Sequence, residues 1–167
     1  MLRRLRPTDL AAFQAYRSIP ELGLYQGWQP MSEQDAIAFI ARMGDAPMFR
    51  PGEWLQLGIV DANDKLIGDV GLFLSEDGEE GEVGFTLEPA AQGKGIATAA
   101  VREAVSLLFS ESTAGYVVAI TDARNEASIR LLKRVGFRLH ESQDTVFRGA
   151  PCTEHTYVFA RERTTTD

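Results

Sequence analysis

The fold is decided at one short segment, Gln92-Gly93-Lys94-Gly95-Ile96-Ala97, where a strand-like run ends and helical spacing begins. The glycines at positions 93 and 95 remove side chains where backbone N–H groups must approach a ligand closely. A helix that starts near Gly95 leaves its first N–H groups unpaired and places the positive end of its dipole at the same point. Lys94 can add a positive charge and Thr98 a hydroxyl group. The segment therefore predicts an anion site suited to a pyrophosphate.

Two common nucleotide-binding motifs are excluded by their spacing. A P-loop needs a glycine five residues before Gly93, where Glu88 stands, and a Ser or Thr directly after Lys94, where Gly95 stands. A dinucleotide-binding fingerprint needs a third small residue, glycine or alanine, at position 98, but Thr98 stands there instead. It also needs a purely parallel sheet. The strands expected before the segment do not provide that parallel context.

The residues on either side of this segment predict a strand–helix–strand unit. Residues 82–87 are typical of a strand, residues 95–109 of a helix with apolar positions four apart, and residues 116–121 of a short buried strand. Such a crossover implies a parallel strand pair. Two earlier runs, residues 54–60 and 66–74, are expected to form an antiparallel meander with 82–87, because turn-forming residues separate them.

The rest of the chain supplies elements that complete the sheet and cover it. They are a strand at 2–5, helices at 7–17, 32–43 and 125–135, closing strands at 137–147 and 153–160, and a Gly-rich and aromatic loop at 20–30. Cys152 is expected in the loop before the last strand. The order of elements predicts an α/β fold whose sheet is mixed but mostly antiparallel.

Length and composition narrow the classes of function. The chain has 167 residues, of which 44% are hydrophobic and 25% charged. This fits one globular domain, predicted at residues 1–163 with a frayed tail at 164–167. The formal net charge of −7 repels phosphate backbones, so no nucleic-acid partner is expected and a cationic molecule such as an amine is favoured.

The single cysteine, Cys152, rules out an intrachain disulfide and argues against a structural zinc site, so no metal is expected. The N-terminus lacks the apolar run of a signal peptide, and no stretch approaches the roughly 20 apolar residues of a membrane span. We therefore expect a cytoplasmic protein without a membrane partner. The sequence leaves the oligomeric state open, a homodimer included.

With its surroundings, the segment 92–97 resembles the GCN5-related N-acetyltransferase (GNAT) superfamily, whose Gln/Arg-x-x-Gly-x-Gly/Ala signature also lies between a strand and a helix. Downstream, Asn125-Glu126-Ala127-Ser128 and Gly136-Phe137 are similar to the helix and strand entry of the ribosomal-protein-alanine acetyltransferase-like branch. Residues 2–9 and 25–28 also look like that branch. The likeness covers almost the whole chain.

The resemblance implies the fold and the acetyl donor. The fold is a GNAT-like sheet of about seven strands flanked by about four helices, in which strands 82–87 and 116–121 form one splayed parallel pair. The donor is acetyl-CoA, whose pantetheine amides pair with exposed strand backbone much as an added strand would. Asn125 can cap its helix, bond the pantetheine arm, or do both. The implied cofactor-binding residues are Phe85, Leu87, Gln92, Gly93, Lys94, Gly95, Ile96, Ala97, Thr98, Asn125 and Ser128.

Acetyl transfer to an amine needs a base for the amine, a donor for the oxyanion and an acid for the leaving thiolate. Glu82 is the candidate base, because the branch often carries a glutamate before a Val/Ile-Gly-aromatic triplet, here Val83-Gly84-Phe85. The alternative is that Glu82 belongs to the solvated acidic run 76–80. Leu132 stands where many members carry the tyrosine that protonates the thiolate, so Ser128 or a water is left as the acid. The oxyanion donor is expected to be a backbone N–H of the splayed strand.

The resemblance also implies an acceptor site walled by the first helices and the loop 20–30. Tyr25 and Trp28 are the candidate substrate-binding residues, with local packing of the loop as the alternative. For Lys133 and Arg134 the alternatives are contact with the 3′-phosphate of the cofactor and simple solvation, and they are interpreted as solvated helix residues outside the site. Three hypotheses of function stay open: N-acetyl transfer to a protein N-terminal amine, N-acetyl transfer to a small amine or aminoglycoside, and acyl-CoA sensing without turnover.

Overall fold

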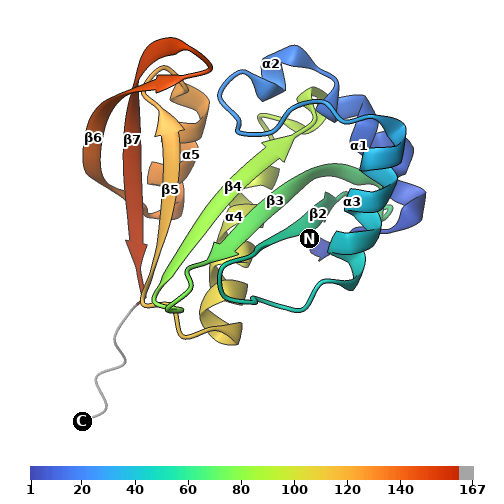
Figure 1. Ribbon diagram of the computed structural model, residues 1–167, viewed down its shortest axis with the longest axis horizontal. Helices are drawn as coiled ribbons and strands as arrows, with labels where there is room; N and C mark the ends of the chain where they lie inside the picture. Colours follow the sequence, from blue (N-terminus) through green and yellow to red (C-terminus); the bar gives the residue numbers. More distant parts are fainter. Residues whose placement is uncertain (162–167) are drawn as a thin grey trace.

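The computed structural model describes residues 1–161 and contains a seven-stranded sheet in the order β1-β2-β3-β4-β5-β7-β6 (Figure 1). The strands are β1 (Leu2–Arg4), β2 (Trp54–Val60), β3 (Leu66–Leu74), β4 (Glu80–Leu87), β5 (Tyr116–Asp122), β6 (Arg138–Phe147) and β7 (Ala150–Ala160). The helices are α1 (Leu10–Arg17), α2 (Pro20–Gly23), α3 (Glu33–Asp45), α4 (Ile96–Glu111) and α5 (Glu126–Val135), with 3-10 turns η1 (Pro7–Asp9) and η2 (Pro89–Ala91). The predicted mixed α/β fold is confirmed, and the predicted tail at 164–167 lies outside the described residues.

The sheet consists of two arms that meet along β4 and β5. Of the strand pairs in the described chain, β4–β5 alone is parallel, and it pairs only residues 80–82 with residues 116–118. Beyond Glu82 the two strands diverge, and the arms open away from each other, with α2 beside one arm and the β6–β7 turn at the end of the other (Figure 1). The predicted splayed parallel pair is therefore present, and its opening is where α4 begins.

Helices cover both faces of the sheet, as the alternation of side chains along β3 shows. Val70 and Leu72 are fully buried in a core shared with α4 and α5, whereas Asp69, directly before Val70, contacts α1 on the opposite face. A smaller core unites α1 and α3 around Phe13 and Ile40. Among the described residues, no helix is both long enough and apolar enough to cross a membrane.

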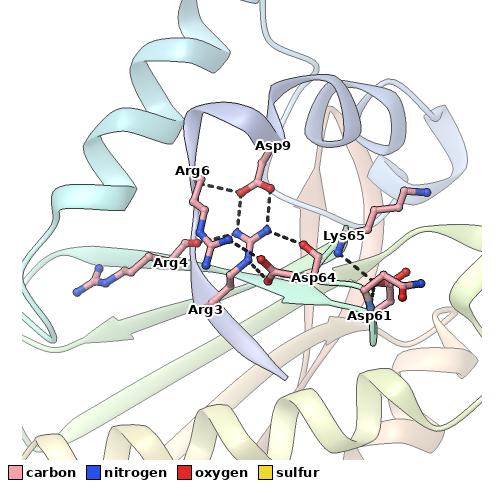
Figure 2. Close-up of polar contacts among 8 residues, drawn as sticks. Arg3, Arg4, Arg6, Asp9, Asp61, Asp64 and Lys65 are labelled. Carbon is pink, nitrogen blue, oxygen red and sulfur yellow. Dashed lines mark hydrogen bonds and ion pairs between the residues drawn. The ribbon is translucent and has the colours of Figure 1, made fainter.

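A cluster of ion pairs fixes the first strand against the start of the first helix (Figure 2). The Arg3 guanidinium donates to both carboxylate oxygens of Asp9, at 2.8 and 2.9 Å, and to Asp64 at 2.7 Å. Asp9 also accepts from the backbone N–H of Arg6 at 2.7 Å. The cluster thereby ties β1, η1 and the β2–β3 turn together and fixes the start of α1, which packs on a face of the sheet against β3.

The prediction of a loop over residues 20–30 was wrong for its first part, because residues 20–23 form the short helix α2. Pro20 occupies the first turn and Glu21 follows it, a combination that suits a helix start because proline needs no N–H partner there and an acidic side chain favours the dipole. The following residues, 24–32, run without regular structure to the Ser32 cap of α3.

The last strand begins earlier than predicted, at Ala150 instead of 153, so the placement of Cys152 in a loop was wrong. Cys152 lies in β7 opposite Thr145. Only Arg148 and Gly149 connect Phe147 to Ala150, and their φ angles of +50° and +79° are those of a type I′ hairpin turn. Because arginine rarely adopts a positive φ, the residue pattern alone did not indicate so tight a turn.

Candidate active site

The start of α4 presents an open group of backbone N–H donors. Gly93 and Gly95 have φ angles of +74° and +79°, the left-handed region that favours glycine. Gly95 is the N-cap of α4 and receives no side-chain capping bond, so the first N–H groups of the helix stay free for a ligand. A Cβ added at either glycine would meet nothing within 4 Å. The segment therefore has the geometry of an anion site, as predicted from its glycines.

Two side chains of this segment turn back onto the chain that precedes them. The Lys94 ammonium group donates to the carbonyl oxygen of Ala90 at 2.9 Å, and it does not line the cleft described below. The Gln92 side-chain amide donates to the carbonyl oxygen of Leu87 at 3.0 Å. These bonds shape the turn η2 between β4 and the glycines.

A cleft of about 590 Å³ lies in the opening between the arms of the sheet. Its walls are the last residues of β4, the glycine segment with the first turn of α4, one side of α5, and α2 with the residues after it. Of the residues predicted from sequence, those lining it are Tyr25, Phe85, Leu87, Gln92, Gly93, Gly95, Ile96, Ala97, Thr98, Asn125 and Ser128. Their convergence on one cavity is what the sequence predicted, while their roles in binding stay predictions.

Eight other residues line the cleft and were not predicted as site residues, and three of them carry side-chain N–H donors. Gln26 follows α2, and Arg130 and Arg134 lie one turn apart on α5. Arg134 donates to the Thr98 hydroxyl at 3.4 Å, which links α5 to the first turn of α4. Arg134 is exposed, which agrees with its interpretation as a solvated residue, and it lines the cleft as well. Its spacing of four from Arg130 was the available signal, because such residues share a helix face.

The splayed half of β4 has backbone acceptors without a strand partner, because pairing with β5 stops at Glu82. Two of these carbonyl groups receive side-chain amides instead. The Phe85 oxygen accepts from the Gln26 amide at 3.0 Å, and the Leu87 oxygen accepts from the Gln92 amide at 3.0 Å. Phe85 and Leu87 are the two positions at which the sequence predicted backbone contacts to a ligand.

Glu82 lies where the two strands begin to part, opposite Phe73 on β3 and Val118 on β5. Burial of its half-buried side chain raises the pKa of the carboxyl group above its ordinary value, and the negative charge of Glu80 raises it further. A carboxylate with a raised pKa is a better proton acceptor than an ordinary one. Glu82 itself does not line the cleft.

The N-terminus of α5 reaches the cleft through its capping residues. The Asn125 side-chain oxygen accepts from the backbone N–H of Ser128 at 3.2 Å, which is the predicted helix cap. Leu132, one turn further on, is only 1% exposed and belongs to the core. Leu132 therefore supplies no proton donor at the position where many GNAT members carry a tyrosine.

The two predicted acceptor residues have different surroundings. Tyr25 lines the cleft, and the Arg124 guanidinium lies 5.7 Å from the centre of its ring. Trp28 instead packs against the sheet: its indole N–H donates to the Thr86 hydroxyl at 3.2 Å, and Arg17 stacks 4.4 Å from its ring centre. Trp28 therefore holds the residues after α2 in place, and a direct contact with a substrate stays a prediction.

Comparison with known proteins identifies this arrangement. The family model described as acetyltransferase (GNAT) domain matches residues 1–138. The chain belongs to the GNAT family. It is 30% identical over 168 residues to the uncharacterized N-acetyltransferase YoaA of Bacillus subtilis (strain 168), covering 98% of this chain and 94% of that protein.

Solved GNAT structures share the fold over nearly the whole chain. A GNAT acetyltransferase from Bacillus anthracis superposes with a TM-score of 0.82 at 18% identity, covering 95% of this chain and 93% of that one. The spermidine N-acetyltransferase from Vibrio cholerae, solved with CoA and spermine, gives a TM-score of 0.80 at 19% identity, covering 96% and 94%.

Family membership confirms the activity and the donor that the sequence predicted. As a GNAT enzyme, the chain is an acetyl-CoA-dependent N-acetyltransferase. The open N-terminus of α4, with its two left-handed glycines, has the free N–H groups and the open space that a pyrophosphate site needs. Membership of the ribosomal-protein-alanine acetyltransferase-like branch stays a prediction.

Proposed function

We propose that this GNAT enzyme acetylates the primary amine of a small cationic molecule in the cytoplasm. The observation that carries the proposal is the cleft in which the α4 N-terminus, the unpaired edge of β4 and the α5 N-terminus converge. Its α2 wall presents the Glu21 carboxylate and the Tyr25 ring, groups that attract an ammonium ion by charge and by cation–π contact. The net charge of −7 acts in the same direction.

In this proposal the described residues bind acetyl-CoA along the edge of β4. The N–H groups after Gly93 and Gly95 hold the pyrophosphate, while the backbone of Phe85 and Leu87 pairs with the pantetheine amides. Arg130 and Arg134 add positive charge on the α5 side. This arrangement directs the thioester toward the residues that follow α2.

The reaction itself needs the proton of the bound ammonium group to leave before attack. Glu82 accepts that proton through a water, because it stands at the start of the splayed part of β4 but does not line the cleft. The amine nitrogen then forms a bond to the thioester carbonyl carbon, and the carbon–sulfur bond breaks as the oxyanion collapses. Ser128 or a water relays the second proton of the attacking nitrogen to the departing thiolate, so the products are a neutral amide and the free thiol of CoA, and much of the rate enhancement comes from holding both substrates in place.

Calorimetry with acetyl-CoA tests the donor site, and release of free thiol in the presence of amines tests turnover. We expect saturable binding and thiol release that depends on the amine. An absence of binding at millimolar acetyl-CoA would contradict the proposed site. Tight binding with no thiol release above background, in wild type and Glu82→Gln alike, would instead favour an acyl-CoA sensor.

Mass spectrometry of products from a mixed acceptor library tests the class of acceptor. The library contains polyamines, aminoglycosides and short peptides with free N-termini. We expect a small cationic amine to gain one acetyl group, a mass increase of about 42 Da. The amine should be acetylated with greater efficiency than any peptide. Exclusive modification of peptide N-termini would refute the small-molecule proposal and support the protein-directed alternative.

A further inference from the structure

The Gln26 side chain occupies a position that the proposed function assigns to the donor. Its amide nitrogen lies 3.0 Å from the carbonyl oxygen of Phe85 and donates a hydrogen bond to it. Phe85 belongs to the part of β4 that no longer pairs with β5. Both Gln26 and Phe85 line the cleft, so this bond forms inside the cavity and not behind it.

The segment that carries Gln26 is also attached to the opposite arm of the sheet. Arg148, in the β6–β7 turn, donates to the backbone oxygens of Gln26 and Trp28 at 2.9 Å each. On the other side, the Trp28 indole is bonded to Thr86 of β4. Residues 26–28 therefore connect the two arms beside the opening between them.

From this geometry we propose that Gln26 is a placeholder for a pantetheine amide of acetyl-CoA. The Gln26 amide satisfies the Phe85 carbonyl in the free enzyme, and the donor's own amide N–H takes its place on binding. The exchange replaces one amide–carbonyl hydrogen bond by another of the same kind. This inference rests on the proposed path of acetyl-CoA along β4.

The consequence is a coupling between the two substrates. Release of Gln26 removes one of the contacts that hold the segment 24–30 on β4, and this segment includes Tyr25 at the acceptor end of the cleft. Donor binding therefore repositions the acceptor wall, which favours an order in which acetyl-CoA binds before the amine. Trp28, held by Thr86 and Arg148, limits how far the segment moves.

Calorimetry on Gln26→Ala tests the placeholder with two ligands. CoA carries the pantetheine amides, whereas adenosine 3′,5′-bisphosphate carries phosphates and adenosine but no amide. Without its competitor, the Phe85 carbonyl is free, so the Kd for CoA should fall about 2- to 10-fold, the range that corresponds to one net hydrogen bond. The Kd for adenosine 3′,5′-bisphosphate should stay unchanged.

Gln29→Ala is the matched control, because it removes the same amide from the same segment at a position beside Arg148 instead of Phe85. Its affinities for both ligands should equal those of the wild type. Equal or weaker CoA binding by Gln26→Ala would overturn the placeholder while leaving the proposed function intact. Failure of the wild type to bind CoA at all would instead refute the proposed donor site.

The fluorescence of Trp28 reports the coupling directly. The chain has two tryptophans, Trp28 and Trp54, so Trp54→Phe leaves Trp28 as the single reporter. CoA should change its emission in this background, and adenosine 3′,5′-bisphosphate should not. Adding Gln26→Ala should remove most of the change that CoA causes. A Trp28 signal that does not respond to CoA, or responds equally to both ligands, would overturn the coupling.

Discussion

Gly95 combines two properties that make it informative at the level of a single residue. Its φ of +79° is strained for any residue with a side chain, and the space in front of it is open. Gly95→Val should therefore cost about 1–2 kcal/mol of stability, the usual penalty of a left-handed conformation, and leave the fold intact. The valine methyl groups would meanwhile block the approach of a phosphate to the N–H groups. We expect acetyl-CoA affinity to fall about 10- to 100-fold, as for lost hydrogen bonds to a charged group.

Gly52→Val provides the control for backbone strain. Gly52 has a φ of +78°, and a Cβ there would meet only the flexible Glu76 side chain. Its backbone pairs with Leu74, at the end of β3 remote from the glycine segment. Urea unfolding should show similar losses for both variants, while calorimetry should show weakened acetyl-CoA binding for Gly95→Val alone. Normal affinity in Gly95→Val would count against the pyrophosphate site.

The raised pKa of Glu82 leads to a prediction about pH. A base must be deprotonated to accept a proton, so kcat/KM should rise as the pH passes upward through the Glu82 pKa, which lies above the ordinary value because of burial and the charge of Glu80. Glu80→Gln removes that negative neighbour, makes deprotonation of Glu82 easier and should shift the acidic limb to lower pH.

Glu82→Gln should abolish this limb and lower the rate by about 10²- to 10⁴-fold, the usual contribution of a general base. The measurement is the pH profile of kcat/KM for an amine found in the acceptor library, at saturating acetyl-CoA. An acidic limb that persists unchanged in Glu82→Gln would show that another group, or the amine itself, sets the pH dependence.

At the scale of elements, α5 depends on its Asn125 cap. Asn125→Ala removes the bond to the Ser128 N–H and should lower the free energy of unfolding by about 1 kcal/mol. Serine is also a good N-cap but lacks an amide, so Asn125→Ser should restore most of that stability. If the Asn125 amide also bonds the pantetheine arm, both variants should bind acetyl-CoA more weakly. Wild-type affinity in Asn125→Ser would reduce Asn125 to a structural cap.

Elements were predictable from the sequence where a periodic apolar pattern or a strong cap marks them. The meander of β2, β3 and β4, the helix α4 and the Asn125-capped α5 all follow this rule. The hairpin at Arg148 was missed because the positive φ of Arg148 is imposed by the pairing of β6 with β7, and not by the residue type. Short helix α2 was missed because four residues cannot show a helical period.

The residues of the candidate site fall into two groups, those that act through local backbone geometry and those that act through contacts between distant parts of the chain. The glycines and Asn125 act through local backbone geometry, which a sequence pattern can reveal. Gln26 reaches Phe85 over 59 positions of the chain, and Arg134 reaches Thr98 over 36. Such contacts depend on how the arms of the sheet are placed, so they could be found only in the folded molecule.

For the molecule as a whole, one buried charge pair joins the helix layer of α1 to the sheet. The Arg17 guanidinium donates to both oxygens of Asp69, at 2.6 and 3.1 Å, and the side chains of the pair are 7% and 1% exposed. The Tyr16 hydroxyl also donates to Asp69. Burial, followed by the charge of Asp69, holds the pKa of Tyr16 well above its ordinary value, so the tyrosine stays protonated and can donate.

Replacing Asp69 by Asn tests how much this pair contributes to the stability of the whole fold. The variant keeps the shape but leaves the Arg17 charge buried without a counter-ion, so the free energy of unfolding in urea should fall by about 3–5 kcal/mol. Asp64→Asn is the matched control, because the Asp64 carboxylate is itself exposed where it pairs with Arg3 and Arg6, and solvent and salt weaken such ion pairs. Its effect should be much smaller and should shrink further in 1 M salt, roughly the concentration at which surface charges are screened within 3 Å. Equal losses in the two variants would mean that the buried pair adds no more than a surface pair, and that α1 is held to the sheet by its apolar contacts.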